Sequence, residues 1–565
     1  MPKTMPKTMP EAMPETGQPT YDVTILGSGI AGSMLAAILA RNGVRVLLLD
    51  AGTHPKFAIG ESTIPYTLVA LRTIAERYDV PEIKTLATFT NSTRLIGPSF
   101  GVKKHFSFML HHEGRPQDPR ETNQFNTPGL LHEASHLFRQ DTDAYLFHVA
   151  VGYGVDQHQN TRVADVAFDD SGVTTITTEG REFRSRYVVD ASGFRSPLAE
   201  KLGLREDPCR FKHNSRSMWN HLVGVPTTDS LFAHRTGPDK PPVPWYEGTV
   251  HHMFDRGWFW VIGFDNHPAS RNPLCSVGLT LDQRRYPQDP NLSAEEEFFA
   301  FAARFPDVER QYAGARAGRE WTRTGRLQYS SRQTVGDRWC LLSHAAAFVD
   351  PLFSRGLSNT AEAINALAGR LIKAVSDDDF SAERFEYVDR LQQGLFDFND
   401  ELVNAAFISF QDYDLWTAVF RIWSWGSNAG TFRLQEGLTR YLKDGRDSHL
   451  QDLEESAHLG FYWPDHEGYR GLFDAMVRQC DLVEAGTVTP RQAADELYDR
   501  LESADFVPKH FGFSDRRRQF LNPTPRTLAK TVRWARTEAD PQVRDMMFSV
   551  GREALLHKVQ GKRIF

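Results

Sequence analysis

A G-x-G-x-x-G pattern near the start of the chain constrains the fold more than any other feature. Its glycines are Gly27, Gly29 and Gly32. The pattern lies between an apolar run at residues 21–26 and a helix-forming segment at 33–41, and a second apolar run at 44–49 ends at Asp50. This order predicts a βαβ unit whose glycines allow a tight turn, a nearby pyrophosphate and close packing of helix on strand. The sequence therefore predicts a bound dinucleotide, FAD or NAD, with its phosphates at the helix N-terminus and Asp50 on its ribose.

Composition limits the partners of the chain. Its 565 residues include 65 basic and 72 acidic side chains, a formal charge of −7. This acidic excess argues against nucleic acid, because phosphate binding needs a basic surface. Aromatic residues make up 12% of the chain, which fits either a large core or a site for flat apolar ligands. The four cysteines form no C-x-x-C pair and predict reduced thiols in a cytoplasmic protein.

One uncharged stretch, residues 23–40, has about the length of a short membrane span. The three glycines interrupt it, and a strand, a turn and a helix explain it better. We therefore expect no membrane segment.

Composition and spacing divide the chain into three parts. Residues 1–19 are a near-repeat with a proline every four residues, which predicts a disordered tail. Residues 20–380 hold the dinucleotide unit and, at about 210–330, an alternation of apolar and polar residues that predicts an antiparallel sheet. Residues 381–565 have the pattern of helices rich in Trp, Phe and Arg. We expect them to form a helical C-terminal domain that covers a substrate site.

Two catalytic motifs occur without the context that they need. His132 and His136 complete an H-E-x-x-H zinc-protease pattern, but the segment around them has no helical spacing and no third ligand nearby. Ser99 is the centre of a G-x-S-x-G pattern, but the residues after it are extended where a hydrolase elbow needs a helix. We interpret both as chance matches and expect no metal site.

Three further motifs allow a functional and a structural interpretation. Trp258 and Trp260 share one face of a predicted strand, either as core or as the wall of a ligand site. Residues 349–356 lie between a strand and a helix, where backbone N–H groups face an anion or a flavin edge, or where Asp350 or Ser354 simply caps the helix. Lys103-Lys104 is, on the structural interpretation, a solvated basic pair.

These motifs together resemble those of the FAD-dependent halogenases, relatives of the p-hydroxybenzoate-hydroxylase-type flavin monooxygenases. Besides the glycine pattern, the resemblance rests on Gly60-Glu61-Ser62-Thr63-Ile64-Pro65, Trp258-x-Trp260-x-Ile262 and Asp350-Pro351-Leu352-Phe353-Ser354-x-Gly356. It extends from about residue 21 through the C-terminal helices and is greatest to the branch that acts on free substrates. It implies an α/β fold with a Rossmann-like FAD-binding domain of the p-hydroxybenzoate-hydroxylase type, an antiparallel sheet on the substrate side and a helical C-terminal domain.

The resemblance also implies a chemistry. Reduced FAD, oxygen and chloride yield hypochlorous acid, which a lysine holds beside the carbon to be chlorinated, by a hydrogen bond or as a chloramine. Lysine suits this role because its amine donates hydrogen bonds and, once desolvated, is a nucleophile. By position Lys103 is the best match, with Lys104 as the alternative. Trp258 and Trp260 are expected to wall the tunnel that separates substrate from flavin.

The other implied site residues bind the cofactor or chloride. Chloride is expected at the backbone N–H groups of Ser354, Arg355 and Gly356, with Ser354 also counted as catalytic. A strap at residues 59–63 is expected between the flavin and the oxidant tunnel. The FAD contacts are expected at Gly27, Ser28, Gly29, Ala31, Gly32, Asp50, Ile59, Glu61, Ser62, Arg139, Val163, Asp190, His344, Asp350 and Leu357.

Three positions depart from the family pattern. Ser343-His344 stands where many flavoprotein monooxygenases have Gly-Asp, which changes the usual ribityl contact. Gly263 follows the W-x-W-x-I element in place of proline. Phe353 replaces a glutamate of the tryptophan halogenases. This last change argues against tryptophan as the substrate and favours a ring that is electron-rich by itself.

The sequence therefore predicts a two-component, FAD-dependent chlorinase of a free aromatic intermediate in antibiotic biosynthesis. A tetracycline-type phenol is favoured over an aminopyrrolnitrin-type pyrrole, because Arg far outnumbers Lys, as in high-GC actinomycetes. The chain has no second nucleotide-binding βαβ unit, so a separate flavin reductase is expected to supply reduced FAD. The alternatives are a hydroxylating flavin monooxygenase, a flavin-binding module without catalysis, and an enzyme that acts on carrier-bound substrates.

Overall fold

The βαβ unit expected at the start of the chain is present. Strand β1 (Tyr21–Leu26) pairs in parallel with β2 (Val46–Leu49), and helix α1 (Ile30–Arg41) connects them. The structure is a computed structural model that describes residues 20–126, 133–522 and 524–548. The tail predicted at residues 1–19 lies outside the described residues.

The first sheet is mostly parallel and has the βαβ unit at its centre. Its other strands are β7 (Asp156–His158), β8 (Val163–Asp169), β9 (Gly172–Thr177), β10 (Glu182–Asp190), β17 (Val335–Gly336) and β18 (Trp339–Leu341). The order is β17-β18-β10-β1-β2-β7, with β9 and then β8 antiparallel beside β10. Helix α1 packs against α4 (Arg139–Gly152) and α9 (Gly356–Asp377). The central strands are therefore buried and read as continuous apolar runs.

The second sheet combines strands from three distant parts of the chain. Its members are β4 (His105–Leu110), β5 (Thr122–Asn126), β11 (Ser215–Val223), β12 (Thr249–Phe254), β13 (Gly257–Gly263), β14 (Leu274–Asp282), β15 (Arg316–Ala317), β16 (Thr322–Arg326) and β19 (Phe520–Leu521). The antiparallel arrangement predicted for residues 210–330 is present from β11 to β14. The whole sheet is mixed, however, because β4 pairs in parallel with β12 and β19 with β5.

Short helices cover the outer face of the second sheet. They are α6 (Thr228–Leu231), α7 (Ala294–Ala302) and α8 (Pro306–Tyr312). Helix α7 begins at a capping box in which Ser293 and Glu296 satisfy each other's backbone N–H groups. Phe298 and Tyr312 pack there with Phe259 of β13 in a hydrophobic core of their own.

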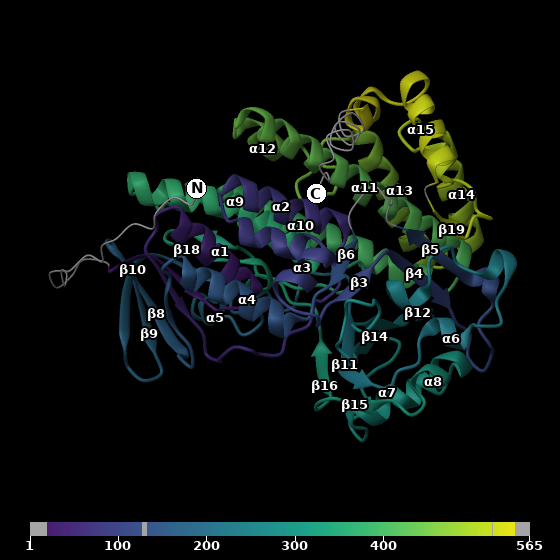
Figure 1. Ribbon diagram of the computed structural model, residues 1–565, viewed down its shortest axis with the longest axis horizontal. Coiled ribbons are helices and arrows are strands. Elements are labelled where there is room, and N and C mark those ends of the chain that lie inside the picture. The colour runs from purple at the N-terminus through teal and green to yellow at the C-terminus, as the bar shows by residue number, and fades with distance from the viewer. Residues whose placement is uncertain (1–19, 127–132, 523, 549–565) are drawn as a thin grey trace.

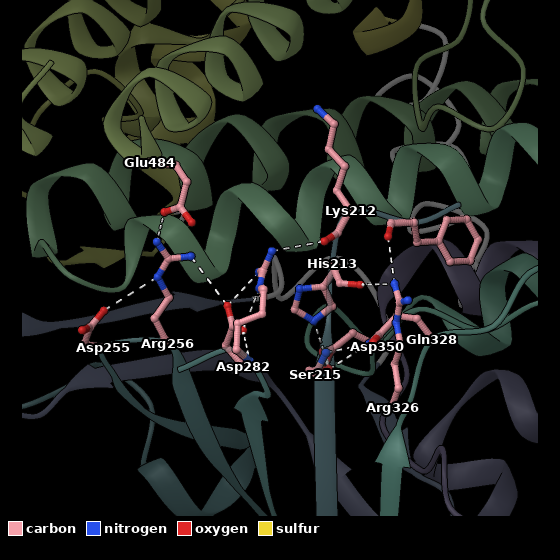
Figure 2. Close-up of polar contacts among 12 residues, drawn as sticks. Lys212, His213, Ser215, Asp255, Arg256, Asp282, Arg326, Gln328, Asp350 and Glu484 are labelled. Carbon is pink, nitrogen blue, oxygen red and sulfur yellow. Dashed lines mark hydrogen bonds and ion pairs between the residues drawn. The ribbon is translucent and has the colours of Figure 1, made fainter. Parts of the chain in front are cut away.

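The C-terminal part of the chain is helical and shares the main hydrophobic core with the first sheet. Its helices are α10 (Ala382–Ser409), α11 (Tyr413–Asp444), α12 (Ser448–Gln451), α13 (Glu467–Glu484), α14 (Pro490–Ser503) and α15 (Pro525–Thr537). They lie across the upper side of the molecule in Figure 1. Arg256 at the β12–β13 turn pairs with Glu484 of α13, and Figure 2 shows this ion pair reaching from the sheet to the helices.

A two-stranded sheet joins the two halves of the molecule. It consists of β3 (Gly101–Lys103) and β6 (Ala134–His136), which lie between the larger sheets in Figure 1. Helices α2 (Pro65–Arg77) and α3 (Phe89–Leu95) precede it in the chain, and α5 (Pro197–Lys201) packs on β8. Among the described residues, no helix is long and apolar enough to cross a membrane. The α/β fold class is confirmed.

Candidate active site

A large cavity opens at the carboxyl ends of β1 and β2, where doubly wound sheets bind their ligands. Its volume is about 1430 Å³. Nine of the predicted cofactor contacts line it: Gly27, Gly29, Ala31, Asp50, Ile59, Arg139, Val163, His344 and Leu357. These residues come from distant parts of the chain, from Gly27 to Leu357, so the fold brings together most of the set that the sequence predicted.

The glycines at this end of β1 leave room for a ligand that a side chain would fill. Gly27 has a φ of +95°, which favours glycine. A Cβ on Gly32 would lie 1.9 Å from the carbonyl oxygen of Gly27, so α1 approaches the turn too closely for any side chain. Helix α1 has no side-chain cap and no acidic residue in its first turn. Its free N–H groups and positive dipole end are thus available to a pyrophosphate.

Asp50, the residue after β2, lines this cavity. Its carboxylate accepts hydrogen bonds from the backbone N–H groups of Ser28 (2.6 Å) and Gly52 (2.8 Å), and Lys56 forms an ion pair with it. Burial alone would raise the pKa of Asp50, but Lys56 and these N–H groups lower it below its usual value. The ionised carboxylate is a ready acceptor for ribose hydroxyls, and these residues fit a dinucleotide.

We expect Asp50→Ala to weaken FAD binding about 10-fold, because a hydrogen bond to a charged group is worth roughly 1.5–3 kcal/mol. Fluorescence titration of the protein with FAD measures the change. Asp165→Ala is the matched control, since Asp165 is half-buried and pairs with Lys201 outside the cavity. An unchanged dissociation constant for the Asp50 variant would contradict the ribose role.

The strap at residues 59–63 has one side toward the cavity and one toward the second sheet. Arg139, itself bound to Asp143 (2.8 Å), donates to the carbonyl oxygen of Ile59 (2.6 Å) and so fixes the cavity side. The Glu61 carboxylate turns away from the cavity and accepts from Nε2 of His221 on β11 (2.6 Å). Ser62 faces β3. The strap therefore connects the cofactor cavity to the region around Lys103.

Lys103 and Lys104 have different surroundings. Lys103 is 2% exposed, donates to Oγ of Ser62 (2.5 Å), and its Nζ lies 3.4 Å above the ring centre of Phe106. Burial lowers the pKa of Lys103 well below its usual value, which favours the neutral amine. Lys104 instead pairs with Glu247 (2.7 Å) and Glu133 (3.4 Å) at the surface. Of the two lysines, Lys103 has the environment of a nucleophile.

The loop predicted to bind chloride is held in place by contacts of Asp350 with Ser215 and His213. The buried carboxylate of Asp350 accepts from Oγ of Ser215 (3.0 Å) and faces Nε2 of His213 (3.3 Å), and Gln328 braces Ser215 (Figure 2). Asp350 therefore holds the loop and does not line the FAD cavity.

The Ser354–Gly356 segment of this loop leads into α9. Ser354 has a φ of +53°. The guanidinium of Arg355 turns to the carbonyl oxygen of Gly460 (3.1 Å) and packs on the rings of Phe398 and Tyr462. Gly356 starts α9 beside His344, whose pKa burial lowers to about 4. The backbone N–H of Ser354 donates to the carbonyl oxygen of Pro351 (2.9 Å), so the predicted chloride contact at Ser354 is taken up within the loop. The backbone N–H groups of Arg355 and Gly356 remain the candidate anion donors, whereas the Arg355 side chain is used in packing.

Other predicted residues have structural partners. Asp190 is fully buried below the cavity and accepts from Ser192, Ser196 and the backbone N–H of Leu198. Ser28 bonds to Asp50 through both its N–H and its hydroxyl group.

Trp258 and Trp260 lie on one face of β13, as their spacing predicted, with ring centres 5.5 Å apart. Trp258 contacts the ring of His251, and Trp260 donates to Oγ of Ser276 (3.2 Å). Both indoles are buried in the main core, and an aromatic cluster continues from them toward Phe353, Trp416 and Trp423. Whether they also wall a tunnel stays a prediction.

Comparison with known proteins identifies the family. The "FAD binding domain" family matches residues 20–236. The chain is 50% identical to tetracycline 7-halogenase of Kitasatospora aureofaciens over 539 residues, 95% of this chain and 96% of that one. It is 43% identical to monodechloroaminopyrrolnitrin halogenase PrnC of Pseudomonas fluorescens over 532 residues, 93% of each chain. The chain belongs to the flavin-dependent halogenases.

A solved halogenase structure has the same fold. The crystal structure of halogenase PltM in complex with phloroglucinol and FAD superposes with a TM-score of 0.85 at 32% identity, covering 89% of this chain and 100% of that one. The predicted family, the enzyme class and the FAD cofactor are thereby confirmed. Bound FAD, once reduced, would supply the oxidation of halide by oxygen. The glycine turn and Asp50 are the residues that would hold FAD, and the buried amine of Lys103 is the candidate nucleophile.

The structure also bears on the two motifs interpreted as chance matches. His136 ends a β-strand, so it does not belong to the helix that H-E-x-x-H requires, and His132 lies outside the described residues. Ser99 is followed by β3 rather than by a helix. The sequence nevertheless gave no indication that His136 and Thr249 lie next to Ser62, where the fold places them. No local pattern predicts these contacts, because they join segments that are far apart in the chain.

Proposed function

We propose that this halogenase chlorinates a free, electron-rich aromatic ring, with a tetracycline-type phenol as the favoured substrate class. The observation that carries the proposal is the buried amine of Lys103, which has no carboxylate among its hydrogen-bond partners in the described residues and lies against an aromatic ring. A neutral amine accepts electrophilic chlorine from hypochlorous acid and passes it to a nearby ring.

Each further role in the proposal rests on a named group. Backbone N–H groups of Arg355 and Gly356 bind chloride, and Trp258 and Trp260 keep substrate away from the flavin. Phe353, packed on Trp423 with ring centres 4.7 Å apart, stands where tryptophan halogenases have a carboxylate. Without that carboxylate, the ring itself must supply the nucleophilicity, as phenols and pyrroles do.

The relatives favour a phenol over a pyrrole. Identity is higher to the tetracycline enzyme (50%) than to the monodechloroaminopyrrolnitrin enzyme (43%), and the PltM structure contains phloroglucinol, a phenol. All three similarities cover the C-terminal helices that we propose as the cover of the substrate site. Chlorination of a pyrrole is the second candidate.

A separate flavin reductase is part of the proposal. The described residues contain one nucleotide-binding βαβ unit and no second one for NADH. All four cysteines are free thiols, as befits the reducing cytoplasm where such a reductase works.

The test is product mass with and without halide. The halogenase is incubated with FAD, NADH, a flavin reductase and a panel of phenols and pyrroles. We expect a chloride-dependent replacement of hydrogen by chlorine, fastest on a phenol, and no turnover when the reductase is left out. A gain of one oxygen without any need for halide would contradict the proposal and indicate a hydroxylating monooxygenase.

A further inference from the structure

Lys103 is the first member of an unbroken chain of hydrogen bonds. Its Nζ bonds to Oγ of Ser62 (2.5 Å), and Ser62 Oγ lies 3.0 Å from Oγ1 of Thr249. Thr249 Oγ1 lies 2.9 Å from Nε2 of His136, and Nδ1 of His136 lies 3.2 Å from the carbonyl oxygen of Gly263. We call these four side chains, Lys103, Ser62, Thr249 and His136, the hydroxyl relay.

Four separate segments assemble this relay. Ser62 lies in the strap, Lys103 ends β3, His136 ends β6 and Thr249 begins β12. A β-bridge joins Ser62 to His136, and β3 pairs with β6. Lys103, Thr249 and His136 are each at most 2% exposed. Backbone pairing in a buried region therefore holds the four side chains in register.

The direction of every hydrogen bond in the relay follows from its last member. A carbonyl oxygen only accepts, so Nδ1 of His136 carries the ring proton, and burial lowers the pKa of His136 to about 3, which keeps the ring neutral. Nε2 must then accept from Thr249. The one proton of the Thr249 hydroxyl is used in this bond, so Thr249 accepts from the Ser62 hydroxyl. Ser62 in turn accepts from Lys103.

His136 is one of three buried histidines near Lys103, and the other two have different partners. His105 places Nε2 on the carbonyl oxygen of Pro244 (3.0 Å) and Nδ1 on the Ser107 hydroxyl (2.7 Å). His251 uses Nδ1 on the carbonyl oxygen of Ser107 (2.9 Å). Burial keeps both rings neutral by lowering their pKa values. His136 is the histidine that the hydrogen bonds connect to the amine.

We propose that the hydroxyl relay orients the neutral amine of Lys103 for halogen transfer. The proposal rests on the proposed function of Lys103. Ser62 accepts a hydrogen bond from one N–H of the amine, which fixes the direction of the nitrogen lone pair that attacks hypochlorous acid. In that attack an N–Cl bond forms and the Cl–O bond breaks, leaving its electron pair on hydroxide. The hydroxide takes up the surplus N–H proton.

The step balances, because the amine proton and hydroxide give water and the chloramine forms with loss of one water molecule. The chloramine then exchanges its chlorine for the ring hydrogen, which restores the amine. Ser62, Thr249 and His136 are positioning residues in this scheme.

The central test removes one hydroxyl group from the middle of the relay. Thr249→Val keeps the shape of the side chain and breaks the chain of hydrogen bonds. We expect chlorinated product per reduced FAD consumed to fall about 100-fold, the usual cost of misplacing a reacting group. Hypochlorous acid caught by a soluble trap should rise at the same time. Thr249→Ser restores the hydroxyl and should recover most of the product.

The control is Thr73→Val, which removes a buried hydroxyl that only bonds to Val69 within α2. We expect this variant to chlorinate normally, which would show that loss of a buried hydroxyl group does not by itself reduce product. Normal chlorination by Thr249→Val, or equal loss in Thr249→Ser and Thr249→Val, would overturn the relay. Normal Thr249→Val beside an inactive Lys103→Met would leave the proposed function standing, whereas absence of halide-dependent product in the unmodified halogenase would contradict that function.

A second readout does not depend on activity. Nitrogen NMR of the full chain, labelled at histidine and assigned with His136→Gln, reports which ring nitrogen carries the proton. We expect a protonated Nδ1 and an unprotonated Nε2. A proton on Nε2 would reverse the direction of the hydrogen bonds, and the relay would be wrong.

Discussion

Replacing Lys103 by methionine is expected to stop chlorination while oxidation of reduced flavin continues. Methionine fills the space of the lysine stem in this buried position but carries no amine. Product should fall at least about 1,000-fold, because the nucleophile that holds the chlorine is lost. The free energy of unfolding should stay constant or rise, since burying an amine is costly and burying a thioether is not. Product mass and a soluble trap for hypochlorous acid measure both effects.

Lys104→Met is the matched control for this prediction. Lys104 pairs with Glu247 and Glu133 at a partly exposed position, where such pairs contribute roughly 0–1 kcal/mol. Its chlorination rate should stay within about 2-fold of the unmodified halogenase. Product from Lys103→Met at a normal rate would remove the amine from the mechanism and leave hypochlorous acid to reach the ring by itself.

Local patterns in the sequence predicted the first half of the fold. The βαβ unit follows from three glycines and two apolar runs, because tight turns, helical spacing and buried parallel strands each leave a mark within a few residues. The pairing of β4 with β12 leaves no such mark. These strands are more than 130 residues apart, and their parallel register depends on the assembled core rather than on either segment alone.

In the candidate site, too, local patterns predicted the backbone but not the long-range side-chain contacts. Gly27, Asp50 and Arg139 line the cavity as the motifs and the family resemblance implied. Asp350 and Arg355 belong to the predicted loop, but their side chains are taken up by Ser215 and by Gly460. A motif identifies the backbone path of a loop, whereas the direction of each side chain depends on neighbours that come from elsewhere in the chain.

His136 shows how a motif can mislead. It occurs in an H-E-x-x-H pattern that is typical of zinc proteases, but it lies in a β-strand rather than in the helix that this pattern requires. The residue is nonetheless fully buried and hydrogen-bonded next to Ser62 and Lys103. Strand pairing between β3 and β6 brings it there, and that pairing becomes visible only in three dimensions.

The second large effect is expected at the glycine turn, where Gly32→Ala should abolish most FAD binding. Alanine in a helix is ordinarily more stable than glycine by about 1 kcal/mol. At Gly32 we expect alanine to lower the stability instead, because the new Cβ would lie 1.9 Å from the Gly27 carbonyl oxygen. That oxygen belongs to the backbone and cannot rotate away. Helix α1 must then move off β1, at a cost of about 1–3 kcal/mol. This displacement takes the helix N-terminus away from the pyrophosphate and should weaken FAD binding about 100-fold.

Gly152→Ala at the end of α4 is the control, because it makes the same substitution at a helical position without a steric clash. A Cβ at Gly152 meets nothing within 4 Å, so this variant should gain stability or stay unchanged and should bind FAD normally. Thermal unfolding and fluorescence titration of both variants test the pair. If Gly32→Ala bound FAD as tightly as Gly152→Ala, the close approach of α1 to the turn would not be what positions the pyrophosphate. The cofactor would then depend on Asp50 and Arg139 instead of on the glycine pattern.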